Sequence, residues 1–278
     1  EPTSTRRPVA ARRALVGSYT ADARGRVAFP HHMLDRRTQR ILNGLRKVTA
    51  GLRPFGESVW PGVRNDLFVA HESIYRFASP HALGANVLDA GCGTGYGSRI
   101  LAEAGASHVL GVDIDRLSVA FARRRYATAT LEFERADCQD LTLLPARFDL
   151  VFASNVLEHL ERPERFVSTA FETLRPGGHA LFAVPPITSG AMAAVHHGIH
   201  YHRSNLTVAA WHALLTAHAW TVNAFAHTFV GPGPHPDFAS PFPSASSPSA
   251  FAFTRVSAGH LQNTPTITAV FLATRAAT

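Results

Sequence analysis

Three aspartates stand where three consecutive predicted strands end. Asp89 closes the first strand, Asp113 closes the second, and Asp137 directly follows the third. If the strands are parallel, their carboxyl ends meet at one edge of the sheet, where ligands bind. Carboxylates accept hydrogen bonds and pair with cations. We therefore expect Asp113 to bind two ribose hydroxyls, Asp137 to bind an adenine amine, and Asp89 to meet an ammonium group directly or through water.

A glycine-rich segment, residues 87–97 (VLDAGCGTGYG), follows the first strand and opens a helix. Because glycine has no Cβ, such a segment lets the backbone approach a ligand closely. The dinucleotide-binding spacing G-x-G-x-x-G does not fit, since counting from Gly91 puts Tyr96 last and a glycine one residue early, at Gly95. Taken alone, the segment also fits an ordinary glycine-rich turn, although less well than a ligand-binding loop. Together with the aspartates it predicts a ligand with an ammonium group, a ribose and an adenine but no pyrophosphate, which describes S-adenosylmethionine.

Five segments carry a family resemblance. In order and spacing, VLDAGCGTGYGS, GVDID, RADCQDL, FDLVFASNVLEHL and LRPGGHALFAVP resemble the class I S-adenosylmethionine-dependent methyltransferases, over roughly residues 65–230. The resemblance implies an α/β fold with a Rossmann-like, doubly wound sheet of seven strands, the last of which, residues 268–274, runs antiparallel. Members usually join the last two strands by a tight hairpin, whereas this chain inserts about forty residues.

The resemblance also implies a set of cofactor-binding residues. They come from the glycine segment and from the ends of the strands that follow: Asp89, Gly91, Cys92, Gly93, Gly95, Asp113, Ile114, Asp137, Cys138 and Asn155. In similar proteins the helix before the core closes over the cofactor. Tyr75 and Glu72 are therefore further candidates for cofactor contact.

The choice of methyl acceptor decides what catalysis requires. An amine only has to be neutral, whereas a hydroxyl must lose its proton during attack and needs a base or a metal. Asn155, Glu158 and His159 follow the fourth strand at the mouth of the crevice. His159 is the leading candidate for the general base, with Glu158 beside it. An equally weighted alternative is structural. In it, Glu158 forms a helix cap or an ion pair and His159 packs under the sheet.

The Ser154–Leu160 run also resembles the matching segment of quinone-biosynthesis O-methyltransferases, some of which bind a divalent cation there through acidic residues and a histidine. That resemblance implies a cation, Mg²⁺, at Glu158 and His159. Asn155 stands where an acid is expected, which weakens the metal interpretation.

Residues 196–202 contain four histidines, His196, His197, His200 and His202. In similar small-molecule methyltransferases a histidine after the fifth strand lines the acceptor pocket. His200 or His202, with Tyr201 and Arg203, fits that position, and we take both histidines as catalytic candidates. A metal site is the alternative, but without paired cysteines the pattern is unspecific.

Alternation of strands and helices organises the core. We predict helices at 33–50, 66–78 (ended by Ser79 and Pro80), after Gly95, 116–126, 163–174 and 206–218, and strands at 87–89, 109–113, 131–135, 148–153, 179–184, 219–229 and 268–274. We divide the chain into a flexible basic arm (1–30), a helical cap (31–80), the cofactor-binding core (81–230), a Pro/Ser-rich loop insertion with a potential role as a lid (231–265), and the last core strand (266–278).

Charge is concentrated at one end of the 278-residue chain. Residues 1–53 contain twelve of the 27 Lys+Arg and three of the 20 Asp+Glu, a net charge of +9, whereas the remainder carries −2. The basic amphipathic helix at 33–50 is expected to pack on the core or on a second subunit. The alternatives are contact with a membrane surface and binding of RNA. No apolar run reaches the roughly 18 residues of a membrane span, and the two cysteines demand no oxidising compartment, so we expect a cytoplasmic protein.

The sequence thus predicts a methyltransferase that uses S-adenosylmethionine to modify a small molecule or glycoconjugate, most readily at a hydroxyl. Two other functions fit the same residues. One is an RNA or protein methyltransferase that docks through the basic arm, although nucleic acid is the less favoured partner because the tryptophans are scattered. The other is a non-catalytic scaffold that only binds the cofactor.

Overall fold

A computed structural model describes residues 20–21, 27–28, 59, 61–143, 148–197, 201–218, 221–238, 240, 242–261 and 263–277. Most of the predicted arm, the whole predicted helix 33–50, and His200 lie outside these residues. Inside the predicted arm, β1 (Thr20–Ala21) and β2 (Val27–Ala28) form a short antiparallel pair. None of the helices in the described ranges is long and apolar enough to cross a membrane.

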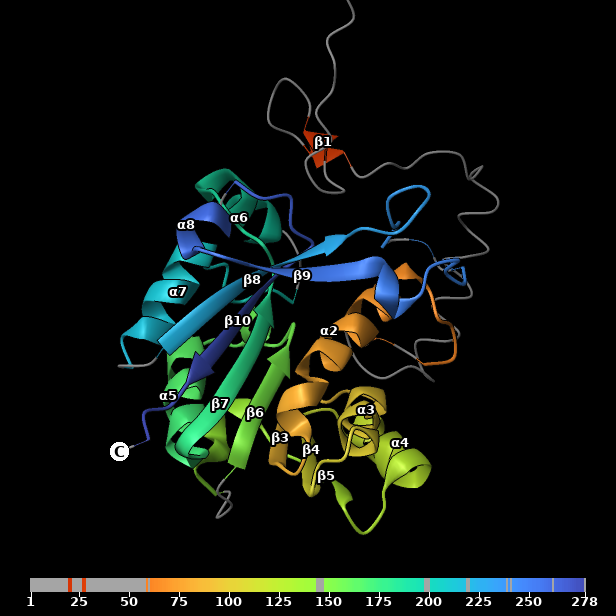
Figure 1. Ribbon diagram of the computed structural model, residues 1–278, viewed down its shortest axis with the longest axis vertical. Helices are drawn as coiled ribbons and strands as arrows, with labels where there is room; N and C mark the ends of the chain where they lie inside the picture. The colour runs from red at the N-terminus through yellow and green to blue at the C-terminus, as the bar shows by residue number, and fades with distance from the viewer. Residues whose placement is uncertain are drawn as a thin grey trace, which may run out of the picture.

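One eight-stranded sheet runs through the core, in the order β5-β4-β3-β6-β7-β10-β8-β9 (Figure 1). The strands are β3 (Asn86–Ala90), β4 (His108–Asp113), β5 (Leu131–Arg135), β6 (Phe148–Ser154), β7 (Leu174–Val184), β8 (Thr221–Phe229), β9 (Phe251–Val256) and β10 (Thr268–Thr274). The first five are parallel, and β10 pairs antiparallel with both β7 and β8. The chain leaves β3 towards β4 on one side and returns to β6 on the other, so the strand order reverses at β3, where ligands bind in doubly wound sheets.

The eighth strand corrects the predicted count of seven. It arises because β9, within the range expected to be loop, pairs antiparallel with β8 from Phe251 to Val256. Phe253 stacks on Phe77 of the helix before the core, with ring centroids 4.2 Å apart, and Phe251 is buried. The apolar side chains of β9 thus gain a packing surface that is remote in the sequence, which local composition does not reveal.

Helices cover both faces of the sheet (Figure 1). One face carries α2 (Asp66–Ala82), α3 (Tyr96–Glu103) and α4 (Arg116–Tyr126), and the other carries α5 (Pro163–Thr173), α7 (Val208–Thr216) and α8 (Ala258–Leu261). Shorter elements are α6 (Gly190–His197) and the 3-10 turns η1 (Cys138–Leu143), η2 (Leu157–His159) and η3 (Pro248–Ala250). Each face buries its own apolar cluster, so the strands between them are apolar on both sides.

Helix α2 continues through Pro80, where the sequence predicts its end. The proline removes one backbone donor only a few residues before the helix finishes at Ala82, and the Ser79 hydroxyl bonds the Tyr75 carbonyl at 3.1 Å. Burial of Ala78 and Ala82 against the sheet continues the apolar face past the proline. Packing therefore outweighs the local preference for termination.

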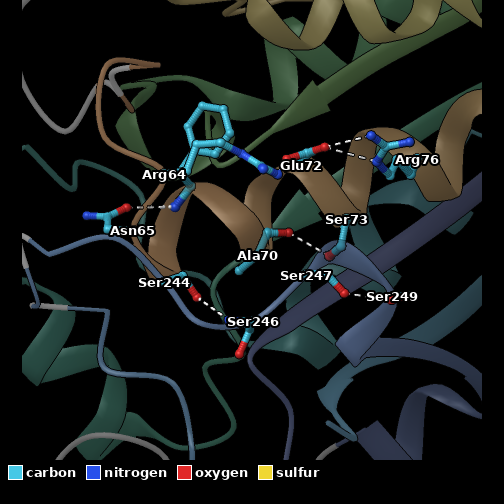
Figure 2. Close-up of polar contacts among 11 residues, drawn as sticks. Arg64, Asn65, Ala70, Glu72, Ser73, Arg76, Ser244, Ser246, Ser247 and Ser249 are labelled. Atoms are coloured by element: carbon cyan, nitrogen blue, oxygen red, sulfur yellow. Dashed lines mark hydrogen bonds and ion pairs between the residues drawn. The ribbon is translucent and has the colours of Figure 1, made fainter.

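The insertion before β10 folds onto the start of α2. Figure 2 shows Asn65 and Arg64 at this end of the helix beside Ser244 and Ser246 of the insertion. The Asn65 amide donates to the Ser240 carbonyl at 3.0 Å, and the Ser244 amide nitrogen donates to the Arg64 carbonyl at 2.7 Å. These contacts join the cap helix to the insertion, for which the sequence allows a role as a lid.

Candidate functional site

Asp89 is the penultimate residue of β3 and is fully buried, and its two hydrogen-bond partners come from neighbouring helices. The Ser98 hydroxyl donates to it at 2.6 Å and the Tyr75 hydroxyl at 3.2 Å. Burial raises the pKa of Asp89 to about 7, the two hydroxyl donors oppose that rise, and nearby Asp113 adds to it. The Asp89 carboxyl group therefore titrates near neutral pH, and a cation placed beside it would favour its charged form.

Asp113 ends β4 and binds the glycine segment to that strand. Its two carboxylate oxygens accept the Gly93 and Asp115 backbone N–H groups, each at 2.8 Å. Burial raises its pKa, and these backbone donors oppose the rise. Each oxygen has further acceptor capacity, which suits the predicted role towards two adjacent hydroxyls. Ile114, the next residue, is 61% exposed, so an apolar side chain stands open beside the carboxylate.

Two glycines of the segment have different physical roles. Both adopt positive φ, +51° at Gly93 and +78° at Gly95. A Cβ at Gly95 would lie 2.7 Å from the Ala122 Cβ and the Phe133 ring, so this glycine permits α3 to pack closely on α4 and β5. A Cβ at Gly93 would meet no atom within 4 Å. Gly93 therefore faces open space at the strand ends, which suits backbone contact with a ligand.

The remaining cofactor candidates of the first three strands divide into exposed and buried residues. Asp137 is exposed and accepts the Gln139 backbone N–H at 2.9 Å. Cys92 and Cys138 are buried free thiols, and burial raises the pKa of both. A thiol with a raised pKa is a poor nucleophile, so neither cysteine is expected to react. Gly91 packs against Val156, beside Asn155.

Asn155 follows β6 with φ +52°, the sole positive φ at a residue other than glycine in the part of the chain that the structure describes. Its backbone N–H donates to the Ala183 carbonyl at 2.8 Å. Its side-chain Nδ2 lies 2.8 Å from Nε2 of His71 on α2. Sequence reasoning did not identify His71. The available signal was its position one helical turn before Tyr75, since residues four apart lie on the same face of a helix.

Tyr75 and Glu72, the two candidates on α2 for cofactor contact, have different partners. The Tyr75 ring packs on Phe152 with centroids 4.5 Å apart, and its hydroxyl reaches Asp89 inside the core. Glu72 instead forms ion pairs with Arg64 and Arg76, as Figure 2 shows. Tyr75 therefore reaches the strand ends, whereas the Glu72 carboxylate is occupied by two guanidinium groups.

A second polar cluster follows Asn155. One ligand atom each from Glu158, His159 and His202 lie within 4.8 Å of one another. Glu158 and His202 are buried, and the rings of His159 and His202 meet edge-on with centroids 5.2 Å apart. The main chain holds the two segments together, because the Glu158 carbonyl accepts the N–H groups of Arg203 and Ser204 at 2.7 and 2.9 Å.

Hydrogen bonds orient both imidazoles of this cluster. His159 Nδ1 lies 3.0 Å from the Tyr201 carbonyl oxygen. Because a carbonyl only accepts, Nδ1 must carry the proton, which leaves Nε2 as the basic nitrogen of the neutral ring. His202 Nδ1 lies 3.2 Å from Nδ1 of His196, with the rings stacked. When His202 is the donor of that pair, its Nε2 is also basic.

The donor set indicates which cation the cluster suits. Two imidazole nitrogens and one carboxylate fit zinc or iron better than Mg²⁺, which prefers oxygen ligands and keeps its waters. Histidine ligands typically bind a backbone carbonyl or another group through the second ring nitrogen, as His159 does with Tyr201. The residues thus fit a borderline divalent cation, and the predicted Mg²⁺ finds no support in this donor set.

Comparison with known proteins agrees with this geometry. Residues 88–182 match a family model described as a methyltransferase domain. A Mycolicibacterium smegmatis protein named "Probable S-adenosylmethionine-dependent methyltransferase" is 38% identical over 132 residues, 47% of this chain and 50% of the relative. A ubiquinone biosynthesis O-methyltransferase of Paraburkholderia phytofirmans is 34% identical over 38% of this chain and 47% of its own. Maize phosphoethanolamine N-methyltransferase 1 is 33% identical over 36% of this chain and 20% of its own.

Solved structures share the fold. An S-adenosylmethionine-dependent methyltransferase of Mesorhizobium loti superimposes with a TM-score of 0.52 and 22% identity, covering 74% of this chain and 98% of the other. Magnesium protoporphyrin IX methyltransferase of Synechocystis, with bound S-adenosylhomocysteine, gives 0.52 and 17% over 85% and 95%. The chain spans about half the length of the M. smegmatis relative. With its glycine segment, strand-end aspartates and parallel sheet, the described core around residues 88–182 is a class I S-adenosylmethionine-dependent methyltransferase domain.

Proposed function

We propose that this protein transfers a methyl group from S-adenosylmethionine to a hydroxyl oxygen of a small molecule or glycoconjugate. The cofactor would lie across the carboxyl ends of β3 and β4, with its ammonium group near Asp89 and its ribose at Asp113. The backbone at Gly93 would approach it where no side chain intervenes. The negative charge of the strand-end carboxylates suits a cofactor that carries both an ammonium and a sulfonium.

The observation that carries the choice of oxygen is the cluster of Glu158, His159 and His202. Methyl transfer is an in-line displacement, so positioning supplies much of the acceleration. A hydroxyl acceptor additionally needs a proton acceptor. His159 offers a basic Nε2 because the Tyr201 carbonyl keeps the proton on Nδ1, and Glu158 would stabilise the imidazolium that forms. An amine acceptor that is already neutral would need no such group.

The same three side chains would hold a divalent cation, if one is bound. Such a cation would act as a Lewis acid that polarises the acceptor oxygen. In that arrangement the Tyr201 carbonyl and His196 would orient the ligating imidazoles through their Nδ1 atoms. His200 stays an untested candidate, because it lies outside the described residues.

Radiolabelled methyl transfer to matched acceptor panels tests this proposal. One panel offers phenolic and sugar hydroxyls, and the other offers primary amines of similar size. The proposal predicts product with hydroxyl acceptors only, and a loss of about 100-fold or more in kcat for His159→Ala at pH 7.5. His212→Ala, a histidine of α7 outside the cluster, serves as the control and keeps full activity. Transfer to amines alone, or a His159→Ala variant as active as wild type, would contradict it.

Other outcomes identify the competing functions. Binding of S-adenosylmethionine without transfer to either panel, and with transfer to RNA that is lost when residues 1–53 are deleted, would favour docking through the basic arm. Binding of the cofactor with no transfer to any acceptor class would favour a scaffold that only binds it.

A further inference from the structure

Helix α2 reaches the strand ends with two polar side chains one turn apart. Tyr75 donates to Asp89 on β3 at 3.2 Å, and His71 lies 2.8 Å from the Asn155 amide at the end of β6. A second anchor lies on β8, where Nε2 of His227 is 2.9 Å from the Ser73 hydroxyl. The helix that carries His71 to Asn155 is thus fixed by hydrogen bonds to two strands, β3 and β8.

The backbone of Asn155 is held in an unfavourable conformation. Its φ of +52° lies in the left-handed region, which residues with a Cβ rarely adopt and which asparagine tolerates better than most. The N–H bond to the Ala183 carbonyl maintains this conformation. Strained residues of this kind gather at functional sites, because the strain aims a side chain that a relaxed backbone would turn elsewhere.

We infer that His71 is a positioning residue that sets which atom of the Asn155 side-chain amide is available to the cofactor, an inference that rests on the proposed function. The amide nitrogen of Asn155 faces Nε2 of His71. Because an amide nitrogen only donates, Nε2 must accept, and the ring is neutral with its proton on Nδ1. Asn155 Oδ1 is then left to accept from the donor groups of S-adenosylmethionine, its ammonium group or its adenine amine.

Protonation of His71 reverses this arrangement. Nε2 then carries a hydrogen and faces the two hydrogens of the amide nitrogen, so two donors oppose each other. The amide relieves the conflict by rotating about its terminal torsion, which places Oδ1 against His71 and Nδ2 towards the cofactor. A donor then meets the donor groups of the cofactor, and affinity falls. The neutral ring is thus the binding-competent state.

The titratable groups around α2 decide how this effect is measured. Burial lowers the pKa of His227 to about 3, so this neighbour stays neutral above pH 5. Burial raises the pKa of Tyr75 and Tyr96, so both phenols stay protonated. Asp89 is the exception, because its pKa of about 7 lies in the experimental range.

The other elements packed against this helix add little. The described side chains of η3 include no titratable group, Arg255 of β9 bonds Asn223, and His179 of β7 lies beside His81, ten residues along α2. The charged groups of α3 and β6 are paired, Arg99 with Glu103 and Asp149 with Arg175. On α2 itself, Glu72 pairs with Arg64 and Arg76. Deprotonation of Asp89 strengthens binding of an ammonium group as the pH rises, as does deprotonation of His71. A variant at position 71 that cannot titrate is needed to separate the two.

Calorimetric titration of S-adenosylmethionine between pH 5 and 8 tests the inference, using wild type, His71→Ala, His71→Gln and the control His81→Gln on the same helix. At pH 8 His71→Ala should bind about tenfold more weakly, the effect of one lost hydrogen bond. Glutamine offers either an oxygen or a nitrogen to Asn155. His71→Gln should therefore bind within about threefold of wild type at pH 8 and lose less affinity than wild type at pH 5.

The results distinguish this inference from the proposed function. If wild type binds the cofactor and His71→Gln shows the same pH profile as wild type, the role of His71 is overturned and the proposed function stays intact. His71→Ala binding as tightly as wild type would do the same. Absence of cofactor binding by the wild type at every pH would overturn both. Thermal unfolding of each variant shows whether it folds, and His71→Gln decides the matter if His71→Ala does not.

Discussion

At the scale of single residues, the site depends on two carboxylates, one buried and one partly buried, that the described residues do not pair with a cation. Among the described residues, Asp89 and Asp113 are bound by hydroxyl and backbone N–H donors and by no arginine or lysine. Burial raises the pKa of both. Negative charge on these carboxylates therefore carries a desolvation cost, and a cationic ligand beside them would reduce that cost.

Substitution of the two glycines should separate ligand binding from folding. Gly93→Ala should cost about 1 kcal/mol of unfolding free energy, from positive φ alone, and should weaken binding of S-adenosylmethionine at least tenfold because the new methyl group enters the cofactor space. Gly95→Ala should cost about 2 to 4 kcal/mol, because its Cβ also collides with Ala122 and Phe133. Urea unfolding and calorimetry on both variants measure the two effects. Equal losses of stability would contradict the assignment.

Sequence reasoning located the strand-end residues but not their partners. The alternation of strands and helices places Asp89 and Asp113 at one edge of any parallel sheet, so their proximity could be predicted. The Ser98 and Tyr75 donors, and the His71 contact with Asn155, depend on how helices dock on the sheet. Such long-range packing has no local signature, and His71 looks like any other helical histidine.

At the scale of elements, α2 contacts both β3, through Tyr75, and β8, through Ser73. Its Ser73 hydroxyl donates to the Ala70 carbonyl at 2.6 Å, so the Ser73–His227 bond requires a proton on His227 Nε2. His227 is fully buried and stacks on Phe253 of β9 with centroids 4.6 Å apart. Nδ1 of this ring finds no partner among the described residues. A neutral, buried imidazole thus joins α2, β8 and β9.

This imidazole should make the protein sensitive to acid. Its pKa of about 3 in the folded protein lies below the 6.5 of an unperturbed histidine, so the unfolded chain takes up the proton first. The contribution to stability is complete above pH 6.5 and is lost as the pH falls, by about 2 kcal/mol at pH 5. His227→Gln cannot titrate, so urea unfolding between pH 7 and 5 should cost wild type about that much more than the variant. Parallel pH profiles would contradict the role of His227.

Elements with strong local periodicity were predicted correctly. The helix at 116–126 and the strands at 131–135 and 268–274 have the predicted bounds. The prediction was wrong where tertiary packing outweighs local preference, as at Pro80 inside α2 and at β9 in a segment rich in proline and serine. The Glu158, His159 and His202 cluster was predicted only in part, because the sequence did not show that residue 202 returns to residue 158.

At the scale of the whole molecule, the excess positive charge and the proposed site lie in different parts of the sequence. The basic residues concentrate in residues 1–53, which carry +9, while residues 54–278 carry −2 and contain every residue of the proposed site. The strand ends carry the carboxylates of Asp89 and Asp113, so polyanions gain nothing there. Attraction of polyanions is therefore a property of the N-terminal segment, not of the methyltransferase domain.

Deletion of residues 1–53 should abolish retention of the protein on heparin, because the remaining chain has a negative net charge. Retention of the full-length protein should weaken steeply as salt increases. Elution of both proteins across a salt gradient measures this. Equal retention of the truncated protein would mean instead that the arginines along α2, α3 and α4 form a sufficient basic surface.

The central claim is that S-adenosylmethionine binds at the strand ends, and calorimetric titration of Asp113 variants tests it most directly. S-adenosylmethionine and S-adenosylhomocysteine are titrated into wild type, Asp113→Ala, Asp113→Asn and the control Glu132→Ala, an exposed acid of β5. We predict micromolar binding by wild type and the control. Asp113→Ala should bind about 100-fold more weakly, because it loses the two charge-assisted hydrogen bonds proposed between Asp113 and the ribose hydroxyls. Asp113→Asn, which preserves one acceptor for the glycine segment, should lie between them. Wild-type protein that binds neither compound, or an Asp113→Ala variant that binds as tightly as wild type, would contradict the site.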